Sequence, residues 1–326
     1  MTTPAPSSTT LGILFVLAGV ICISVNDLVI KQLSGDYSLH QSVFIRSTIG
    51  ILFSLILVQL EGGWRILRTK TPFWHAFRGI LIVIANMTYF AALAALPLAD
   101  VTALFFAAPL FITLLSIPIL GEKVGLLRMG AVSVGFIGVV IMQRPWEDAG
   151  SIDVPRIVLV LPVIAAFTYA LNQILTRKLG GATKASAMAV YIQATFIVVS
   201  LGFYVAAGDG RYAQGQTNES LIFLLRAWTW PTAQDWPYFI VLGVNSAAIG
   251  YCLSQAYRLA DAATVAPYEY IGLPLAVFWG WVIFAELPVL EVWIGIALIL
   301  GAGLFVFLRE QQKSRAVLRA SKITTR

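Results

Sequence analysis

Ten long apolar segments follow one another along this chain, and they constrain its fold more than any other feature. A helix needs about 20 residues, at about 1.5 Å rise per residue, to cross about 30 Å of hydrocarbon. Open sheet edges do not occur in lipid, so the segments must be helices. We therefore predict an all-α integral membrane protein with ten transmembrane helices, near residues 11–32, 40–60, 75–96, 100–120, 125–143, 156–178, 184–206, 236–258, 262–285 and 290–308.

The composition supports the membrane class and leaves little room for other chemistry. Only 12% of the residues are charged, against roughly 25% in a soluble domain. Cys22 and Cys252 lie inside apolar segments, where cysteine is a small buried hydrophobe. The chain has no Gly-Lys-Ser/Thr phosphate loop, metal-ligand spacing or nucleophile motif. We expect no cofactor, no metal and no enzymatic activity.

The positions of the basic residues predict the orientation of the chain. If the N-terminus is cytoplasmic, sixteen of the 22 Lys and Arg residues lie on the cytoplasmic side and five lie outside, with Arg46 inside a segment. This bias follows the positive-inside rule, so both termini should face the cytoplasm from an inner or plasma membrane. It also explains the net charge of +6 without a nucleic-acid partner. The polar N-terminus has no basic n-region, so no cleaved signal peptide is expected.

The two halves of the chain carry similar landmarks. Pro109, Gly130 and Gly138 recur 165 residues later as Pro274, Gly295 and Gly303. Lys31 and Arg46 have the spacing of Lys178 and Gln193, at an offset of 147, and the difference in offset places an insertion at 207–235. Five helices per half would make the second copy inverted, an architecture typical of alternating access. The predicted parts are a tail at 1–10, repeats at 11–143 and 156–308, and a basic tail at 309–326.

Short motifs in both halves resemble a known family. Ala-Asp-Val-Thr-Ala at 99–103, Pro109, Gly121-Glu122 and Gly130-Ala131 resemble the EamA repeat of the drug/metabolite transporter superfamily, and Asp261-Ala262-Ala263, Pro274, Glu286 and Gly295 resemble its second copy. The chain departs from that pattern in its 207–235 loop and at Ala285, where the second copy usually has Gly. The resemblance implies ten helices and transport of small organic solutes such as amino acids, nucleosides or other metabolites. As motif residues, Glu122 and Glu286 are expected to cap the helices that follow them.

Charged residues inside the apolar segments need a reason, because each costs roughly 2.5–3.5 kcal/mol at mid-bilayer on insertion scales. Asp27 and Arg46 fall at similar depths near the outer ends of their helices. They form either a charged layer that meets substrate, or an internal Asp27–Arg46 or Asp27–Lys31 pair that joins helices. Lys31 is also close enough to the border to extend toward the interface.

An inner polar layer is expected nearer the cytoplasm, with Asn172, Gln173, Gln193 and Glu269. Glu269 lies between Tyr268 and Tyr270, where it could bind a cation or take up a proton. The alternative is an ion pair with a Lys or Arg at the rim. The helix-bend or gate residues are expected to be Pro109, Pro267 and Pro274, because proline releases backbone groups at a bend.

The interpretation that these features favour is a secondary transporter of a small polar or aromatic solute, working by alternating access. Its partners are the bilayer, a small-molecule substrate and either coupled protons or an exchanged solute, and the pattern carries no prediction of oligomeric state. A scaffold or lipid-handling protein without solute flux is the alternative. The predicted pathway residues are Asp27, Arg46, Asn86, Tyr89, Tyr169, Asn172, Gln173, Glu269 and Tyr270.

Overall fold

The regular structure of the described part of the chain is helical throughout. The computed structural model describes residues 8–121, 124–144, 146, 154–179, 183–260, 265 and 268–324. The helices are α1 (Ser8–Leu33), α2 (Leu39–Glu61), the short 3₁₀ helix η1 (Trp64–Leu67), α3 (Pro72–Ala95), α4 (Leu98–Phe105), α5 (Ala108–Leu120), α6 (Leu126–Gln143), α7 (Arg156–Leu179), α8 (Ala185–Ala207), α9 (Glu219–Leu225), α10 (Trp236–Leu259), α12 (Gly272–Phe284) and α13 (Leu290–Thr324).

Eight helical stretches within the described residues are long and apolar enough to cross a membrane. They correspond to the first eight expected segments, with α4 and α5 together forming the fourth. The last two expected segments contain shorter apolar helices, Gly272–Phe284 and Leu290–Phe305, and part of 262–285 lies outside the described residues. Large apolar side chains such as Leu60, Leu126 and Val205 are exposed on the outer faces, as lipid contact requires. The protein is therefore an integral membrane protein, and its described part is helical.

In each half a break in the helix is followed within a few residues by a proline. Phe106 and Ala107 separate α4 from α5, and Pro109 lies in the first turn of α5. Tyr270 and Ile271 form a turn before α12, and Pro274 lies in its first turn. Proline is tolerated there because the first-turn N–H groups have no intrahelical partner. Pro267, the third expected bend residue, lies outside the described residues.

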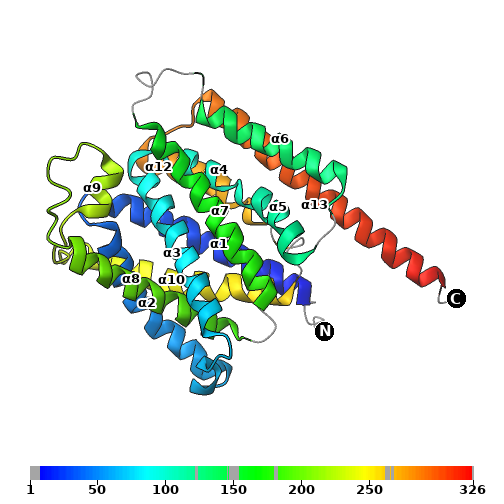
Figure 1. The fold of residues 1–326 in the computed structure, drawn as a ribbon, viewed down its shortest axis with the longest axis horizontal. Helices are drawn as coiled ribbons and strands as arrows, with labels where there is room; N and C mark the ends of the chain where they lie inside the picture. Colours follow the sequence, from blue (N-terminus) through cyan, green and yellow to red (C-terminus); the bar gives the residue numbers. More distant parts are fainter. Residues whose placement is uncertain are drawn as a thin grey trace.

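The long helices pack in a pattern that crosses between the halves. α1 packs on α10, α3 on α7, α2 on α8, and α6 on α13, and α4 packs on both α7 and α12. Figure 1 shows the paired α6 and α13 along one edge of the bundle, with α2 and α8 on the opposite side. α1 begins and α13 ends on the same side, at the right of the view. The expected tail at 309–326 is mostly a continuation of α13, which is helical to Thr324.

The inserted segment 207–235 folds back onto the end of α1. It contains α9, which packs on α2 and α3. Tyr37 donates a 2.6 Å hydrogen bond to Asp235, and the backbone N–H of Thr229 donates to Gln41 at 3.1 Å. The insertion therefore covers the end of the bundle at which α1 finishes, which we call the Lys31 end.

A glycine contact sets how closely α6 and α13 approach, and it provides a stability prediction. A Cβ built on Gly138 would lie 3.0 Å from the carbonyl oxygen of Gly295 and 3.0 Å from Leu298 Cβ, whereas one on Gly130 meets nothing within 4 Å. Small residues let membrane helices approach closely, and overpacking costs about 1–3 kcal/mol. We expect Gly138→Val to lower the melting temperature in detergent by several degrees. Gly130→Val, in the same helix, is the matched control, and an equal loss in both variants would exclude the packing explanation.

Candidate substrate cavity

A cavity of about 230 Å³ lies between the two halves of the bundle, with walls from α1, α2, α3, α4, α7, α8, α10 and α12 and the turn before α12. This is slightly below the roughly 300–1,000 Å³ of drug-sized ligand sites, which is the scale of a site for one small metabolite. Residues from the expected outer charged layer and the expected inner polar layer face this one space. The predicted pathway residues that line it are Asp27, Arg46, Asn86, Tyr89, Tyr169, Asn172, Gln173 and Glu269.

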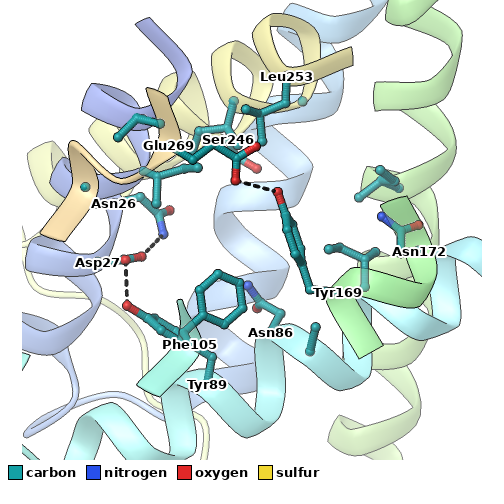
Figure 2. A pocket seen from close by; sticks show the side chains of 18 of the residues that line it. Asn26, Asp27, Asn86, Tyr89, Phe105, Tyr169, Asn172, Ser246, Leu253 and Glu269 are labelled. Carbon is teal, nitrogen blue, oxygen red and sulfur yellow. Dashed lines mark hydrogen bonds between the residues drawn. The ribbon is translucent and has the colours of Figure 1, made fainter. Parts of the chain in front are cut away.

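Asp27 forms the first polar centre of the cavity (Figure 2). Tyr89 donates a 2.9 Å hydrogen bond to Asp27 Oδ2, and the Asn26 amide donates to Oδ1 at 3.3 Å. The Tyr89 hydroxyl also lies 3.0 Å from the Thr102 hydroxyl, which joins α3 to α4. Asp27 itself is 8% exposed, so a carboxylate far from bulk water faces the cavity. Its charge is balanced by neutral donors rather than by direct contact with a base.

Arg46 forms the second centre, and it meets Asp27 only through an intermediate. Its Nη1 donates to Asn26 Oδ1 at 3.1 Å and its Nη2 to Asn86 Oδ1 at 2.9 Å. The guanidinium packs against the rings of Phe90 and Phe196, 5.7 and 5.2 Å from their centroids. Its Nε is buried without a hydrogen-bond partner. The direct Asp27–Arg46 pair considered from the sequence is therefore replaced by an Asp27–Asn26–Arg46 bridge.

Glu269 forms the third centre, on a different side of the cavity (Figure 2). Its Oε1 accepts a hydrogen bond from Tyr257, and its Oε2 accepts one from Tyr169 at 3.5 Å. Gln173, one turn beyond Tyr169 on α7, donates to the Tyr169 hydroxyl at 2.7 Å. Among the residues that the structure describes, no Lys or Arg forms an ion pair with Glu269. The expected alternative, a salt bridge at the rim, is not present there.

An aromatic wall separates the two carboxylates. The Phe105 ring lies 5.2 Å from the Tyr89 ring and 5.2 Å from the Tyr169 ring, measured between centroids. Figure 2 shows Phe105 between these two tyrosines, on the same side as Asn86. Such faces stack on flat rings and attract cations. The cavity therefore combines a flat apolar surface with hydrogen-bonding groups at its borders.

Lys31 closes the bundle beyond the cavity instead of pairing with Asp27. Its ammonium donates to Glu286 Oε1 and Oε2 at 2.9 and 2.7 Å and to the Leu96 carbonyl at 3.0 Å. Glu286 also accepts from the backbone N–H of Leu98, at 3.3 Å. The Asp27–Lys31 pair and the extension of Lys31 into the interface are therefore wrong. Glu286 was expected to cap α13, the helix that follows it in sequence. It instead caps the start of α4, because the fold brings the free backbone N–H of Leu98 within reach. Glu122 lies outside the described residues.

Tyr270 is the predicted pathway residue that does not line the cavity. Consecutive residues of a helical turn point about 100° apart, so the neighbour of a cavity residue can either line the cavity, as Gln173 does beside Asn172, or face another helix, as Tyr270 does beside Glu269. Tyr270 packs on Phe106, with ring centroids 5.3 Å apart, and against Gly303 of α13. Pro109 and Pro274 also lie outside the cavity wall.

Several cavity residues were missing from the set predicted from sequence. Asn26 is an amide inside an apolar segment, which is the same signal that marked Asn86 and Asn172. Thr102 carries no such signal, because a threonine in a membrane helix can bond to its own backbone. Arg78 was one of the sixteen basic residues assigned to the cytoplasmic side, yet it lies in α3, is 4% exposed and lines the cavity. Its position three residues inside the expected 75–96 segment was the available signal. Tyr257 lay at the end of another segment, where a tyrosine is typical of the membrane interface.

Comparisons with known proteins agree on the class of this chain. Residues 10–144 match the EamA-like transporter family. The chain is 30% identical over 307 residues to a riboflavin transporter of Vibrio cholerae, covering 93% of this chain and 95% of the relative. It is 29% identical to a riboflavin transporter of Rhizobium johnstonii, with 95% of each chain covered. An S-adenosylmethionine uptake transporter of Rickettsia prowazekii is 26% identical, over 92% of this chain and 94% of the relative.

A solved structure supports the same fold. It superimposes with a TM-score of 0.64 over 92% of this chain and 98% of its own length, at 18% identity. The relatives from Vibrio cholerae, Rhizobium johnstonii and Rickettsia prowazekii are named transporters, which favours neither the scaffold alternative nor an enzyme. The chain belongs to the EamA-like transporter family of the drug/metabolite transporter superfamily, and it is a secondary membrane transporter of a small organic metabolite.

Proposed function

We propose that the protein carries a flat, uncharged heteroaromatic metabolite of the riboflavin type through the cavity by alternating access. The observation that carries this proposal is the Tyr89–Phe105–Tyr169 wall, bordered by amide, carboxyl and guanidinium groups. Aromatic faces would stack on the ring, and the polar border would pair with its carbonyl and N–H groups. Similarity to riboflavin transporters over more than nine-tenths of the chain points to the same substrate.

The formal charge of the cavity favours a neutral or dipolar solute over a cation. Its wall contains two carboxylates, Asp27 and Glu269, and two guanidinium groups, Arg46 and Arg78. A sulfonium cation of the S-adenosylmethionine type is the second candidate, because Glu269 has only tyrosine partners in the described residues and a relative is named for that substrate. The two arginines would oppose such a cation, which ranks it second.

Two inverted five-helix repeats, at 11–143 and 156–308, would provide the alternating-access mechanism. The packing pattern supports this architecture. An inverted repeat that equates α1 with α7 and α3 with α10 converts the α1–α10 contact into the α7–α3 contact, and it leaves the α2–α8 and α6–α13 pairs unchanged. The helix interruptions at Phe106 and Ile271 are also 165 residues apart, the offset of the proline and glycine landmarks. The Pro109 and Pro274 turns would act as the bending points.

Ten spans with both termini in the cytoplasm would place the Lys31 end outside, in an inner or plasma membrane. The Lys31–Glu286 ion pair and the inserted segment 207–235 would then close the external side. This orientation follows the distribution of basic residues. Cysteine labelling of intact cells at Gly215 and Arg68 would test it, because both positions are exposed and lie at opposite ends of the bundle.

Proteoliposome uptake tests the substrate assignment. We expect saturable accumulation of labelled riboflavin, competition by other flat heteroaromatic solutes, and little uptake of S-adenosylmethionine. Phe105→Ala, which removes the middle ring of the aromatic wall, should weaken riboflavin uptake about 5- to 10-fold, in line with about 1 kcal/mol for an aromatic stack. Phe73→Ala, at an exposed ring outside the cavity, is the control. Uptake of S-adenosylmethionine but not riboflavin would move the assignment to the cationic candidate.

A further inference from the structure

Arg78 is a buried cation in the cavity wall that the proposed function does not yet use. Its side chain is 4% exposed, and among the described residues no carboxylate lies within ion-pair distance of it. Its contacts are neutral: Nε donates to the Thr176 hydroxyl at 3.0 Å, and Nη1 approaches His75 Nδ1 at 3.4 Å and the Met188 sulfur at 3.5 Å. A buried guanidinium held by neutral groups alone retains unused attraction for an oxygen acceptor.

The acid at the end of α2, Glu61, is engaged elsewhere, and the described residues offer Arg78 no ion-pair partner. Glu61 accepts hydrogen bonds from the backbone and hydroxyl of Ser186, at 3.3 and 2.8 Å, and from Gln255 at 2.9 Å. Among the described residues no hydrogen bond involves Arg78 Nη2. That nitrogen carries two of the five guanidinium N–H donors, which leaves them available to a solute.

α7 provides a polar stripe that connects Arg78 to Glu269. Tyr169, Asn172, Gln173 and Thr176 all line the cavity, at the spacing that places helical residues on one face. Tyr169 contacts Glu269, and Thr176 contacts Arg78. Seven residues at 1.5 Å rise separate the two contact points by about 10 Å. Between them, Asn172 Oδ1 is buried without a hydrogen-bond partner.

We propose that Arg78, Thr176 and Asn172 form a subsite for the oxygen-bearing chain of the solute, about 10 Å along α7 from the ring-binding end at Glu269 and Phe105. The substrate class is then an elongated molecule with a flat ring at one end and hydroxyl or acid oxygens at the other. This inference rests on the proposed function and adds a second recognition element to it. Arg78 binds the oxygen-bearing chain of the solute, and the aromatic wall binds its ring.

Two ligands that differ only in the hydroxylated chain on the ring can distinguish a binding role of Arg78 from a structural role. Binding of riboflavin, and of the same ring with a methyl group in place of the hydroxylated chain, is measured by equilibrium dialysis on purified protein. Arg78→Gln should weaken riboflavin binding about 10- to 100-fold, the effect of losing a charged hydrogen bond, and change the binding of the bare ring less than about twofold. Arg78→Lys should recover part of the riboflavin affinity. Arg68→Gln, at an exposed arginine, is the control.

Equal losses for riboflavin and the bare ring in Arg78→Gln, or no loss for either, would overturn the subsite. If the unmodified protein binds neither flavin, the substrate proposal fails, and a second pair tests the subsite independently. That pair is an aromatic carboxylate and its parent ring, compared by thermal-shift titration. A preference for the acid that disappears in Arg78→Gln supports the subsite, and equal shifts for acid and parent ring in the unmodified protein contradict it.

Discussion

Replacing Glu269 with Gln is expected to abolish uptake driven by a pH gradient while leaving solute exchange intact. Glu269 is held by the hydroxyls of Tyr257 and Tyr169 on the cavity wall, without a basic partner among the described residues. Glutamine has nearly the same shape and still accepts hydrogen bonds, but it cannot release and rebind a proton. If proton movement through Glu269 drives transport, the variant should keep its affinity and lose accumulation.

The measurement compares two fluxes in the same proteoliposomes. Concentrative uptake is followed with an imposed pH gradient, and counterflow is followed with equal pH on both sides and unlabelled solute inside. Glu219→Gln, at an exposed acid in the inserted segment, is the control. Equal loss of both fluxes would assign Glu269 to substrate binding or to structure, and retention of both would exclude it as the coupling group.

Replacing Arg46 with Met is expected to produce the largest loss of stability among the cavity variants. The guanidinium joins Asn26 of α1, Asn86 of α3 and the rings of Phe90 and Phe196. Its removal leaves the side-chain oxygens of buried Asn26 and half-buried Asn86 without this donor, and it takes away the positive charge near Asp27. Breaking such a buried charge network costs about 3–5 kcal/mol, so the melting temperature in detergent should fall by about 10 °C or more.

A conservative variant and a surface control make the Arg46 result interpretable. Arg46→Lys keeps the charge, but lysine lacks the forked guanidinium that reaches both amide oxygens. Its melting temperature should therefore lie between those of the unmodified protein and Arg46→Met. Arg65→Met, at an exposed arginine, should melt like the unmodified protein. A normal melting temperature for Arg46→Met together with lost riboflavin binding would instead make Arg46 primarily a substrate contact.

The contrast between Arg46 and Arg78 follows from their partners. Both terminal nitrogens of Arg46 are hydrogen-bonded, and its one unpaired nitrogen, Nε, is buried, whereas the unpaired nitrogen of Arg78 among the described residues is the terminal Nη2. We therefore expect the first variant to be defective mainly in stability and the second mainly in recognition. The sequence places each residue inside an apolar segment and does not distinguish these roles.

The amino-acid sequence alone determined the class of the fold and the approximate position of each long helix. The length of an apolar segment can be read directly from the sequence, and a single such segment in lipid must be helical to satisfy its backbone hydrogen bonds. The sequence also predicted part of the polar lining of the cavity, because an ionisable or amide group in such a segment avoids lipid by facing the protein interior. Eight of the nine predicted pathway side chains line the cavity for this reason.

Only the tertiary structure decided which polar groups meet. A helix that is apolar on all faces does not reveal its rotation about its own axis, so Glu269 could not be separated from Tyr270 by pattern. Pairs distant in sequence were also hidden: Lys31 meets Glu286, 255 residues away, and Asn26 bridges Asp27 to Arg46. Helix packing across the two halves brings these partners together. Because a buried charge without a partner is costly, packing that pairs it is favoured.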